Sequence, residues 1–438
     1  MTTPIFDFVK RYANSKTVRF HMPGHKGFGE LGCERFDITE ISGADVLYSA
    51  EGIINESENS LTSIYGTAHS FYSTEGSTLA IKAMLALVGE RGGEERPLVL
   101  AARNAHAAFI RAAALLDLDV EWLYPERAEH LCSCKITAND VDVALSSMEK
   151  KPRALYVTSP DYLGNMLDIA SISAVCKNHG IPLLVDNAHG AYLKFLEEDV
   201  HPISLGAAMC ADSAHKTLPV LTGGAYLHIS KDFAELVPNA RGALSIFAST
   251  SPSYLTLASL DLCTKRLSED YPEKIRSLAK KTEEVKRQIS SLGFEVVDSE
   301  PLKIVIRGNL AEHLRRCGIE PEFSDFEYTV LMLTPENNDS DFESLISALE
   351  QTKPEKSSAL GVAPKPHKQV MTVRRAIFSP SETICAKDAV DRICAAPTVS
   401  CPPAVPIVIS GEKITADDVK LFEYYGIETL SVTKTDSI

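Results

Sequence analysis

Between residues 75 and 186 the chain alternates helical and strand patterns, and this alternation constrains the fold more than any other feature. Apolar residues recur at helical spacing in three segments, and a short apolar run of strand length follows each of them. Strands separated by helices of this length predict βαβ units and a mainly parallel sheet covered on both faces. The predicted helices lie within residues 81–88, 109–116 and 169–177, and the predicted strands are residues 97–101, 120–124, 154–158 and 182–186.

The later part of the chain predicts two smaller domains. A long helical region at residues 255–291, interrupted near Tyr271-Pro272, connects to three short strands and a helix that are typical of a small α/β domain. The polar stretch 351–358 is typical of a linker. We therefore predict an α/β protein of three parts. These are an N-terminal segment with the large domain at residues 1–265, a small α/β domain at 266–352, and a linker with a C-terminal α+β domain at 353–438.

Composition and charge exclude several classes of protein. The 438 residues carry a net charge of -15, which argues against nonspecific binding of nucleic acid, because that needs a basic surface. No stretch stays apolar for the ~20 residues of a membrane span, and the first residues lack the features of a signal peptide. The ten cysteines form no CxxC pair, which suits reduced thiols. We expect a soluble cytoplasmic protein without nucleic-acid or membrane partners.

Two polar residues near the last predicted strand of the large domain suggest the chemistry. Ligands of parallel α/β sheets bind beyond the carboxyl ends of the strands, and Asp186 ends the strand 182–186. Lys216 follows later, in Ser213-Ala214-His215-Lys216-Thr217. A lysine that can form a Schiff base and an aspartate that can hold a pyridinium nitrogen are the minimum for pyridoxal 5'-phosphate (PLP) chemistry. Taken alone, Lys216 could equally be a solvated surface charge and Asp186 a turn or helix cap.

Other residues suit the binding of such a cofactor. Gly76, Ser77 and Thr78 stand at the start of the first predicted helix, where backbone N–H groups, the helix dipole and two hydroxyls can hold a phosphate. Simple N-capping is the alternative. His106 can stack on an aromatic ring or cap a helix, and His189 can orient Asp186, handle a proton or satisfy a turn.

The remaining glycine and histidine patterns predict no other ligand site. His21 and His25 have i, i+4 spacing, but the intervening Pro23 and Gly24 disfavour a regular helix, and neither HExxH nor a Cys/His cluster occurs. We therefore predict no metal site. The GxGxxG match at residues 27–32 follows no strand and opens no apolar helix, so it predicts no dinucleotide site.

Five motifs occur together in this chain: His21–Gly27, Glu75–Thr78, Asp186–Gly190, Ser213–Thr217 and Thr250–Tyr254. In this order they resemble the bacterial ornithine/lysine/arginine decarboxylases, which are PLP enzymes of the aspartate-aminotransferase fold, PLP fold type I. The segment from Pro402-Pro403 to Gly411-Glu412 is similar to that family's C-terminal domain. The resemblance implies PLP-dependent decarboxylation of arginine, lysine or ornithine to a polyamine-pathway amine and CO2.

The resemblance also implies roles for the candidate residues. Lys216 would carry the Schiff base, Asp186 would keep the pyridine nitrogen protonated, and His106 and Ala188 would contact opposite faces of the ring. It further implies a homodimer with the active site at the interface, where residues 250–254 would serve the neighbouring subunit. The catalytic set is Lys216, Asp186, His106 and His189, and the cofactor-binding set is Gly76, Ser77, Thr78, His106, Asp186, Ala188, Ser213, His215 and Lys216.

Some features depart from the family pattern. Glu75 stands where members usually carry Asn, and Ala107 and Ala108 stand where a Lys and a Ser usually follow the stacking histidine. The chain begins almost directly at the cofactor domain, so the decameric assembly of members with an N-terminal wing domain is not expected. Glu322 and Asp325 are candidate partners for the distal cation of the substrate, with solvated loop charges as the alternative.

Two other functions fit the same residues. An aminotransferase or another PLP lyase of the same fold is the alternative enzyme, because fold and cofactor do not fix which Cα bond breaks. An inactive PLP-binding regulatory protein is the alternative of a different class. The presence of both Lys216 and Asp186 favours an enzyme.

Overall fold

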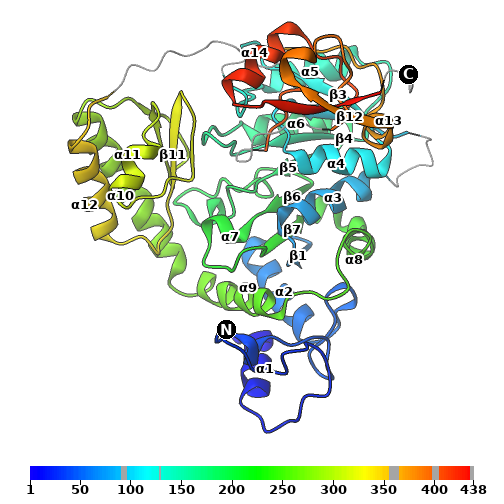
Figure 1. The fold of residues 1–438 in the computed structure, drawn as a ribbon. Coiled ribbons are helices and arrows are strands. Elements are labelled where there is room, and N and C mark those ends of the chain that lie inside the picture. Colours follow the sequence, from blue (N-terminus) through cyan, green and yellow to red (C-terminus); the bar gives the residue numbers. More distant parts are fainter. Residues whose placement is uncertain (90–95, 128–129, 355–364, 397–403, 435–438) are drawn as a thin grey trace. The chain divides into compact units, whose positions relative to one another are not determined.

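A computed structural model describes residues 1–89, 96–127, 130–354, 365–396 and 404–434 (Figure 1). The chain forms two compact units. The first unit comprises Met1–Leu87 and Leu184–Ser277, and the second comprises Val88–Leu183 and Leu278–Ile438. Helices and strands alternate in both units. In the described ranges, no helix combines the length and apolar character needed to cross a membrane.

The first unit contains the strand order β1-β7-β6-β5. β6 (Met209–Asp212) lies parallel to β5 (Leu183–Asp186), and β7 (Ala225–Ile229) runs antiparallel to both β6 and β1 (His69–Ser73). β1, β5 and β6 therefore share one direction, so their carboxyl ends lie at the same edge of the sheet. Nearly every residue of these strands is buried, which is typical of a sheet covered on both faces.

The helices of the first unit are tied together through one buried carboxylate. Asp261 of α9 (Tyr254–Leu267) accepts hydrogen bonds at Oδ2 from the backbone N–H groups of Ile5 and Phe6, both at 2.9 Å. Because these amides belong to the first turn of α1 (Pro4–Ala13), they have no partner within the helix. Asp261 also accepts from Ser57 Oγ of α2 (Ile53–Tyr65) at 2.6 Å, so it joins three helices.

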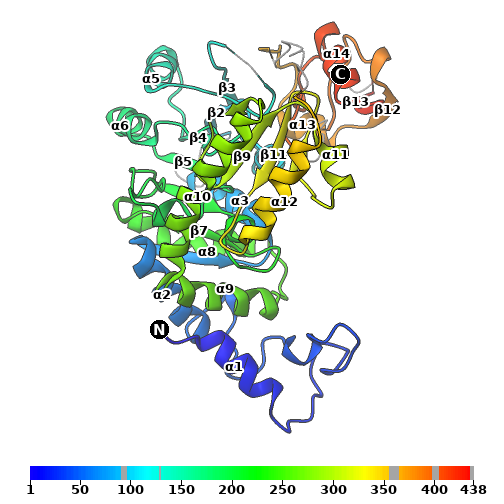
Figure 2. The ribbon, with the colours of Figure 1, turned by 90° about the vertical axis from the view of Figure 1, so that its left-hand side faces the viewer.

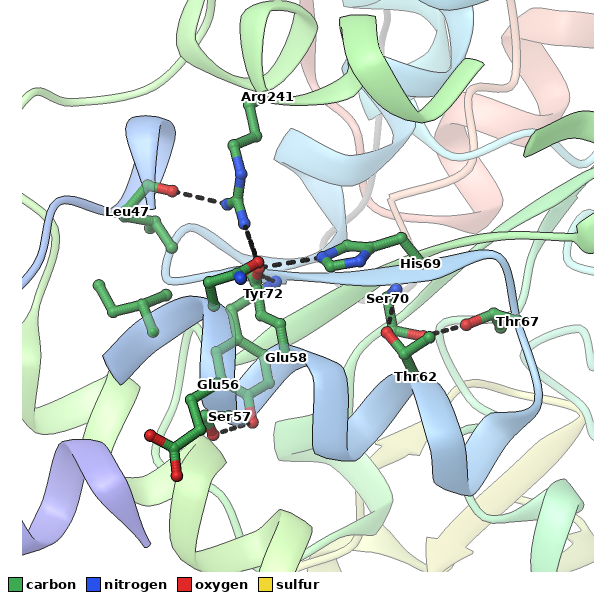
Figure 3. A network of polar contacts seen from close by, with 12 residues as sticks. Leu47, Glu56, Ser57, Glu58, Thr62, Thr67, His69, Ser70, Tyr72 and Arg241 are labelled. Carbon is green, nitrogen blue, oxygen red and sulfur yellow. Dashed lines mark hydrogen bonds and ion pairs between the residues drawn. The ribbon is translucent and has the colours of Figure 1, made fainter. Parts of the chain in front are cut away.

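A second buried carboxylate fixes β1 (Figure 3). The side chain of Glu58, in α2, is fully buried and pairs with Arg241 NH2 of α8 (Val237–Ser245) at 2.6 Å and with His69 Nε2 at 3.2 Å. Glu58 also accepts from the Tyr72 backbone N–H at 2.9 Å. A buried carboxylate is tolerated only when it is paired and hydrogen-bonded. The contacts at His69 and Tyr72 hold both ends of β1, whose carboxyl end leads into α3 (Gly76–Gly89).

The second unit contains the other parallel strands. β2 (Leu98–Ala102) lies parallel to both β3 (Asp119–Leu123) and β4 (Ala154–Thr158). The helices that follow these strands are α4 (Ala107–Leu116), α5 (Ala138–Ser147) and α6 (Ile169–His179). The predicted alternation of helices and strands is confirmed, with strand bounds displaced by at most one residue. A mixed α/β fold with a large, mainly parallel sheet is therefore confirmed as well.

A separate antiparallel sheet in the second unit has the strand order β10-β11-β9-β8. Figure 2 shows α10 and α12 along one face of this sheet. The predicted interruption near Tyr271 is confirmed, because α9 ends at Leu267 and α10 begins at Tyr271. The strands are β8 (Val296–Val297), β9 (Lys303–Arg307), β10 (Phe323–Ser324) and β11 (Tyr328–Met332), and the helices are α10 (Tyr271–Ser291), α11 (Ala311–Arg316) and α12 (Asp339–Glu350).

The C-terminal part of the second unit supplies most of a small hydrophobic cluster, which Leu131 completes. β12 (Ser381–Cys385) pairs with β13 (Thr429–Thr433), and α13 (Val373–Phe378) and α14 (Ala416–Tyr424) accompany them. The predicted Cys401-Pro402-Pro403 motif and linker residues 355–358 lie outside the described residues. The division into three domains at residues 265 and 352 stays a prediction.

Candidate active site

Three of the predicted site segments follow the carboxyl ends of β1, β5 and β6 in the first unit. Asp186 is the last residue of β5, and Asp212, the last residue of β6, leads into α7 (Ala214–Thr217), which carries Lys216. Ser73 ends β1, and α3 begins at Gly76. Because these strands share one direction, the topology brings the three segments to the same sheet edge.

Lys216 and His189 are in direct contact. Lys216 Nζ lies 3.0 Å from His189 Nε2, and the His189 side chain is buried. The turn after β5 makes this contact possible, since the Gly190 N–H donates to the Asn187 carbonyl at 2.8 Å. A Cβ at residue 190 would lie 2.1 Å from Asn187 Oδ1, so the turn requires glycine. At 3.0 Å a proton can pass between the lysine nitrogen and the imidazole.

Asp186 is buried at the end of β5. Its Oδ1 accepts a hydrogen bond from the Ala188 backbone N–H at 3.2 Å, which fixes the carboxylate relative to the turn. Asp186 stands opposite Ala211 in the parallel ladder with β6. A buried carboxylate in this position suits a cationic ring nitrogen, because a charge partner offsets the cost of burial. Ala188, also buried, presents a small apolar side chain beside it.

The start of α3 has the chemistry of a phosphate site. Ser213 Oγ donates to Ser77 Oγ at 2.8 Å, so a hydroxyl that follows β6 meets a hydroxyl in the first turn of α3. The first N–H groups of a helix lack intrahelical partners and favour an anion. Gly76 has φ +72° and its N–H donates to the Gly223 carbonyl at 2.7 Å. A Cβ at Gly223 would lie 2.7 Å from the Thr74 carbonyl oxygen, so both glycines permit this close approach.

Glu75 and His215 have partners of their own beside this helix start. Glu75 Oε1 accepts from the Ser249 backbone N–H at 2.7 Å, so the carboxylate contacts the loop before α9. His215 Nδ1 donates to the Gly224 carbonyl at 2.9 Å. Burial lowers the pKa of His215, and the neighbouring Lys216 lowers it further. A neutral His215 presents its Nε2 as an acceptor, so its predicted phosphate contact requires a proton on that nitrogen.

Sequence reasoning missed Asp212, which lies between the lysine loop and the Asp186 turn. Its fully buried carboxylate accepts from Asn187 Nδ2 at 2.8 Å and lies 3.0 Å from His201 Nε2 and 3.3 Å from His228 Nε2. Burial favours the neutral acid, but the two imidazoles outweigh it and hold the pKa of Asp212 below its usual value. The carboxylate thereby orients Asn187, the residue next to Asp186. One feature of the sequence could have indicated Asp212, namely its place directly before the Ser213–Thr217 motif that carries Lys216.

The same cluster has the composition of a metal site, but hydrogen bonds account for it. His201 Nε2, Cys210 Sγ and an Asp212 oxygen lie within 4.8 Å of one another. His201 Nδ1 accepts from the Ile203 backbone N–H at 3.4 Å, which leaves the proton of the neutral ring on Nε2, facing Asp212. A metal would need a lone pair on that nitrogen. We therefore describe the cluster as a hydrogen-bond network.

Replacing Asp212 with asparagine is expected to lower the free energy of unfolding by about 3 kcal/mol. Removing one partner from a buried charge network costs roughly 3–5 kcal/mol, and the amide retains part of the hydrogen bonding. Because the pKa of Asp212 is lowered, its contribution is present above the ordinary value of 3.8 and is lost only in acid. Urea unfolding of the PLP-free protein at neutral pH measures the change. Asp199→Asn is the control, because the partly exposed ion pair between Asp199 and Lys194 contributes less than about 1 kcal/mol to the free energy of unfolding. An equal loss of unfolding free energy in the two variants would contradict the role of Asp212.

The other sequence candidates have hydrogen-bond partners of their own. His106, in the second unit, is the N-cap of α4, and its Nδ1 accepts from the Ala108 N–H at 3.1 Å. This hydrogen bond is the helix-capping geometry. It involves only the edge of the imidazole ring of His106, so stacking of that ring on the cofactor stays a prediction. His21 contacts the Tyr12 hydroxyl, and His25 Nε2 contacts Asp37 at 3.1 Å.

The two carboxylates considered for the substrate cation also have partners. Asp325 lies 2.8 Å from His130 Nε2, and its other oxygen accepts from the N–H groups of Glu327 and Tyr328, both at 2.8 Å. Glu322 accepts from the Tyr162 hydroxyl at 2.6 Å. The buried Asp325 therefore serves the structure of the β10–β11 turn, since three donors already satisfy it.

Comparison with known proteins assigns the family. The family described as "Orn/Lys/Arg decarboxylase, major domain" matches residues 3–310. The chain belongs to the Orn/Lys/Arg decarboxylases. An arginine decarboxylase of Bacillus subtilis is 29% identical over 95% of this chain and 92% of its own length, and one of Bacillus anthracis is 28% identical over 95% and 92%. The constitutive lysine decarboxylase of E. coli superposes with a TM-score of 0.78 at 17% identity, over 99% of this chain and 82% of that chain, and so shares the fold.

Membership in the Orn/Lys/Arg decarboxylases fixes the class of chemistry. Enzymes of this family are PLP-dependent lyases that decarboxylate amino acids, so the chain is an amino-acid decarboxylase that uses PLP. The residues at the sheet edge fit this cofactor. Asp186 offers a buried anion for the ring nitrogen, Lys216 offers an amine, and the hydroxyls beside α3 suit the phosphate.

Proposed function

We propose that this decarboxylase acts on a basic amino acid, preferring arginine to lysine and ornithine, and that the resulting amine enters the polyamine pathway. The named arginine decarboxylases among its relatives, which align over nearly the whole chain, support arginine. One observation carries the catalytic assignment, namely the 3.0 Å contact between Lys216 Nζ and His189 Nε2 at the strand edge that ends in Asp186.

We assign the following roles to the residues of the chain. Lys216 would attach the cofactor covalently, and Asp186 would keep a proton on the ring nitrogen. PLP, when bound, supplies an electron sink for the bond that breaks as CO2 leaves. His189 would take a proton from Lys216 Nζ or return it, so either residue could deliver the proton that Cα requires.

The remaining predicted residues would bind and orient. Ser77, Thr78 and Ser213 would donate to the phosphate, with Gly76 allowing close approach and His215 contributing if it is protonated at both nitrogens. His106 would contact one face of the ring and Ala188 the other. These contacts would hold the Cα–carboxylate bond perpendicular to the ring, the geometry that directs which bond breaks.

We further propose a homodimer in the cytoplasm, with the active site at the subunit interface. The segment 250–254 would face the neighbouring site, because Thr250 and Ser251 are exposed while Tyr254 is buried in its own unit and donates to the Asp45 carbonyl at 2.6 Å. The described cysteines are free thiols, which supports a reducing compartment.

Incubation of the PLP-loaded protein with arginine, lysine and ornithine tests the proposal. We expect CO2 and the corresponding amine, with kcat/KM highest for arginine by about 10-fold or more, the discrimination that about 1.4 kcal/mol provides. Amine and CO2 are measured separately, and keto acids are assayed in the same samples. Keto acid in place of CO2 would indicate an aminotransferase. PLP binding without any product would indicate a regulatory protein.

A further inference from the structure

We propose that the C-terminal region acts as a clamp that positions His106, and that Arg103 links this clamp to the loop that carries His106. The clamp is defined as residues 404–412. The inference rests on the proposed contact between His106 and the cofactor. It gives a function to the Gly411-Glu412 motif, which the chemistry of the site does not use.

Arg103 joins the loop that carries His106 to the clamp. Its guanidinium donates from NH1 to the Pro406 carbonyl at 2.9 Å and from NH2 to the Ile407 carbonyl at 2.8 Å. The side chain is 4% exposed, and NH2 lies 3.9 Å from Glu412 Oε2. Hydrogen bonds from a charged donor are stronger than neutral ones, and the planar fork fixes the direction of both. Arg103 thus holds the loop three residues before His106.

A backbone hydrogen bond holds the same loop directly after His106. The Ala107 N–H, at the first position of α4, donates to the Ala404 carbonyl at 2.9 Å. Ala404 has φ +56°, in the left-handed region of backbone conformations. Ala107 and Ala108 are 1% and 0% exposed. The two alanines that depart from the family pattern therefore stand where the helix start is closed off from solvent.

The far end of α4 is held by a residue outside the clamp. Arg374, in α13, donates from NH1 to the carbonyl groups of Ala114 and Leu115, both at 3.1 Å. The last carbonyls of a helix have no partner within it, so a cation there satisfies them and complements the dipole. The C-terminal region therefore contacts α4 at both ends, but only the contacts at its start adjoin His106.

The clamp itself is firmly packed. Val405, Ile407 and Val408 are buried in a hydrophobic cluster with Phe422 of α14 and residues of β13. Glu412 Oε2 accepts from the Ile409 N–H at 2.7 Å, which closes the segment into a turn. Gly411 has φ +90°, and a Cβ there would lie 2.2 Å from the Met371 carbonyl oxygen. The segment can therefore hold a fixed position against Arg103.

Variants at the two ends of α4 separate positioning from general stability. We expect Arg103→Met to raise the dissociation constant of PLP by about 10-fold or more and to alter the visible circular dichroism of the bound cofactor. Arg374→Met, the matched control, is expected to lower the unfolding temperature while changing that dissociation constant less than about 2-fold. Trp122, the only tryptophan, lies 5.8 Å from the Arg103 guanidinium, so its fluorescence reports on the clamp in the PLP-free protein.

A second variant covers the case in which Arg103→Met does not fold. Ala107→Pro removes the N–H that donates to Ala404, and proline suits the first helical position. His106 has φ -63° and ψ 152°, which a residue before proline can adopt. We expect this variant to fold and to reproduce the weakened PLP binding. Wild-type PLP binding in it, or in a folded Arg103→Met, would overturn the proposal.

A double-mutant cycle with His106→Ala decides whether Arg103 acts through His106. If it does, Arg103→Met adds little to the loss of PLP affinity already caused by His106→Ala. Additive losses would overturn the clamp as a positioning device. These measurements use PLP affinity, so they stay valid if the amino-acid assay finds no decarboxylation. Failure of the proposed function and failure of the clamp are therefore distinguishable.

Discussion

Replacing Lys216 with alanine is expected to reduce decarboxylation to the level of the buffer blank. Alanine lacks the amine that can bond covalently to the cofactor aldehyde. The substitution also removes the 3.0 Å contact between Lys216 Nζ and His189 Nε2. PLP should still bind through the groups beside α3, but dialysis should remove it. Product formation and the visible absorbance of the dialysed protein measure both effects.

Chemical trapping makes the Lys216 experiment specific. Borohydride reduction of the wild-type protein with PLP, followed by proteolysis and mass spectrometry, should place the cofactor on the peptide that contains Lys216. The matched control is Lys231→Ala, since Lys231 is an exposed lysine of the same unit, and it should keep full activity and the same label. Retained decarboxylation in Lys216→Ala, or a label on another lysine, would refute the assignment.

The sequence predicted those parts of the fold in which a short segment has a clear local pattern, such as an apolar run or a proline. The strand that ends in Asp186 is a continuous apolar run, as expected of a parallel strand covered on both faces, and its bounds differ from the prediction by one residue. The break between α9 and α10 follows from Pro272, because proline is tolerated only in the first turn of a helix.

β1 and β7 were missed because they bury polar side chains. β1 contains Ser70 and Ser73, and β7 contains His228, so neither shows an apolar run. Ser70 Oγ lies 2.8 Å from His228 Nδ1, a partner 158 residues away along the chain. Polar groups are buried here because they satisfy each other, and no local pattern reveals such a pair.

The candidate site shows the same limit. Lys216, Asp186 and the start of α3 could be found from residue types after strand ends, since the carboxyl edge of a sheet is a local property. The partners that orient them could not. His201 and His228 reach Asp212 only through the tertiary fold, and the Glu75 carboxylate contacts the Ser249 N–H, 174 residues further on. The clamp on His106 likewise depends on the hydrogen bonds from Arg103 to Pro406 and Ile407, which lie 303 and 304 positions further along the chain.

Replacing Asp186 with asparagine is expected to lower kcat by about 10²–10³-fold, the usual cost of removing one group that stabilises charge in a transition state. Asparagine keeps the size of the side chain and can still accept from the Ala188 N–H, but it carries no negative charge to retain a proton on the ring nitrogen. Single-turnover release of CO2 from arginine measures the effect, and PLP affinity, measured alongside, should change far less than kcat.

A cofactor analogue methylated at the ring nitrogen tests the electrostatic cause. Because its positive charge is permanent, it does not need a carboxylate to hold a proton, so it should restore much of the rate in Asp186→Asn. The matched variant is Asp212→Asn, in which a buried carboxylate is lost from the end of the adjacent strand β6. Asp212 contacts Asn187 and two histidines, so its loss disturbs position rather than ring charge, and the analogue should restore nothing. Equal rescue of both variants would show that Asp186 has no special relation to the ring nitrogen, whereas rescue of Asp186→Asn alone would separate the charge-holding residue from the one that positions it.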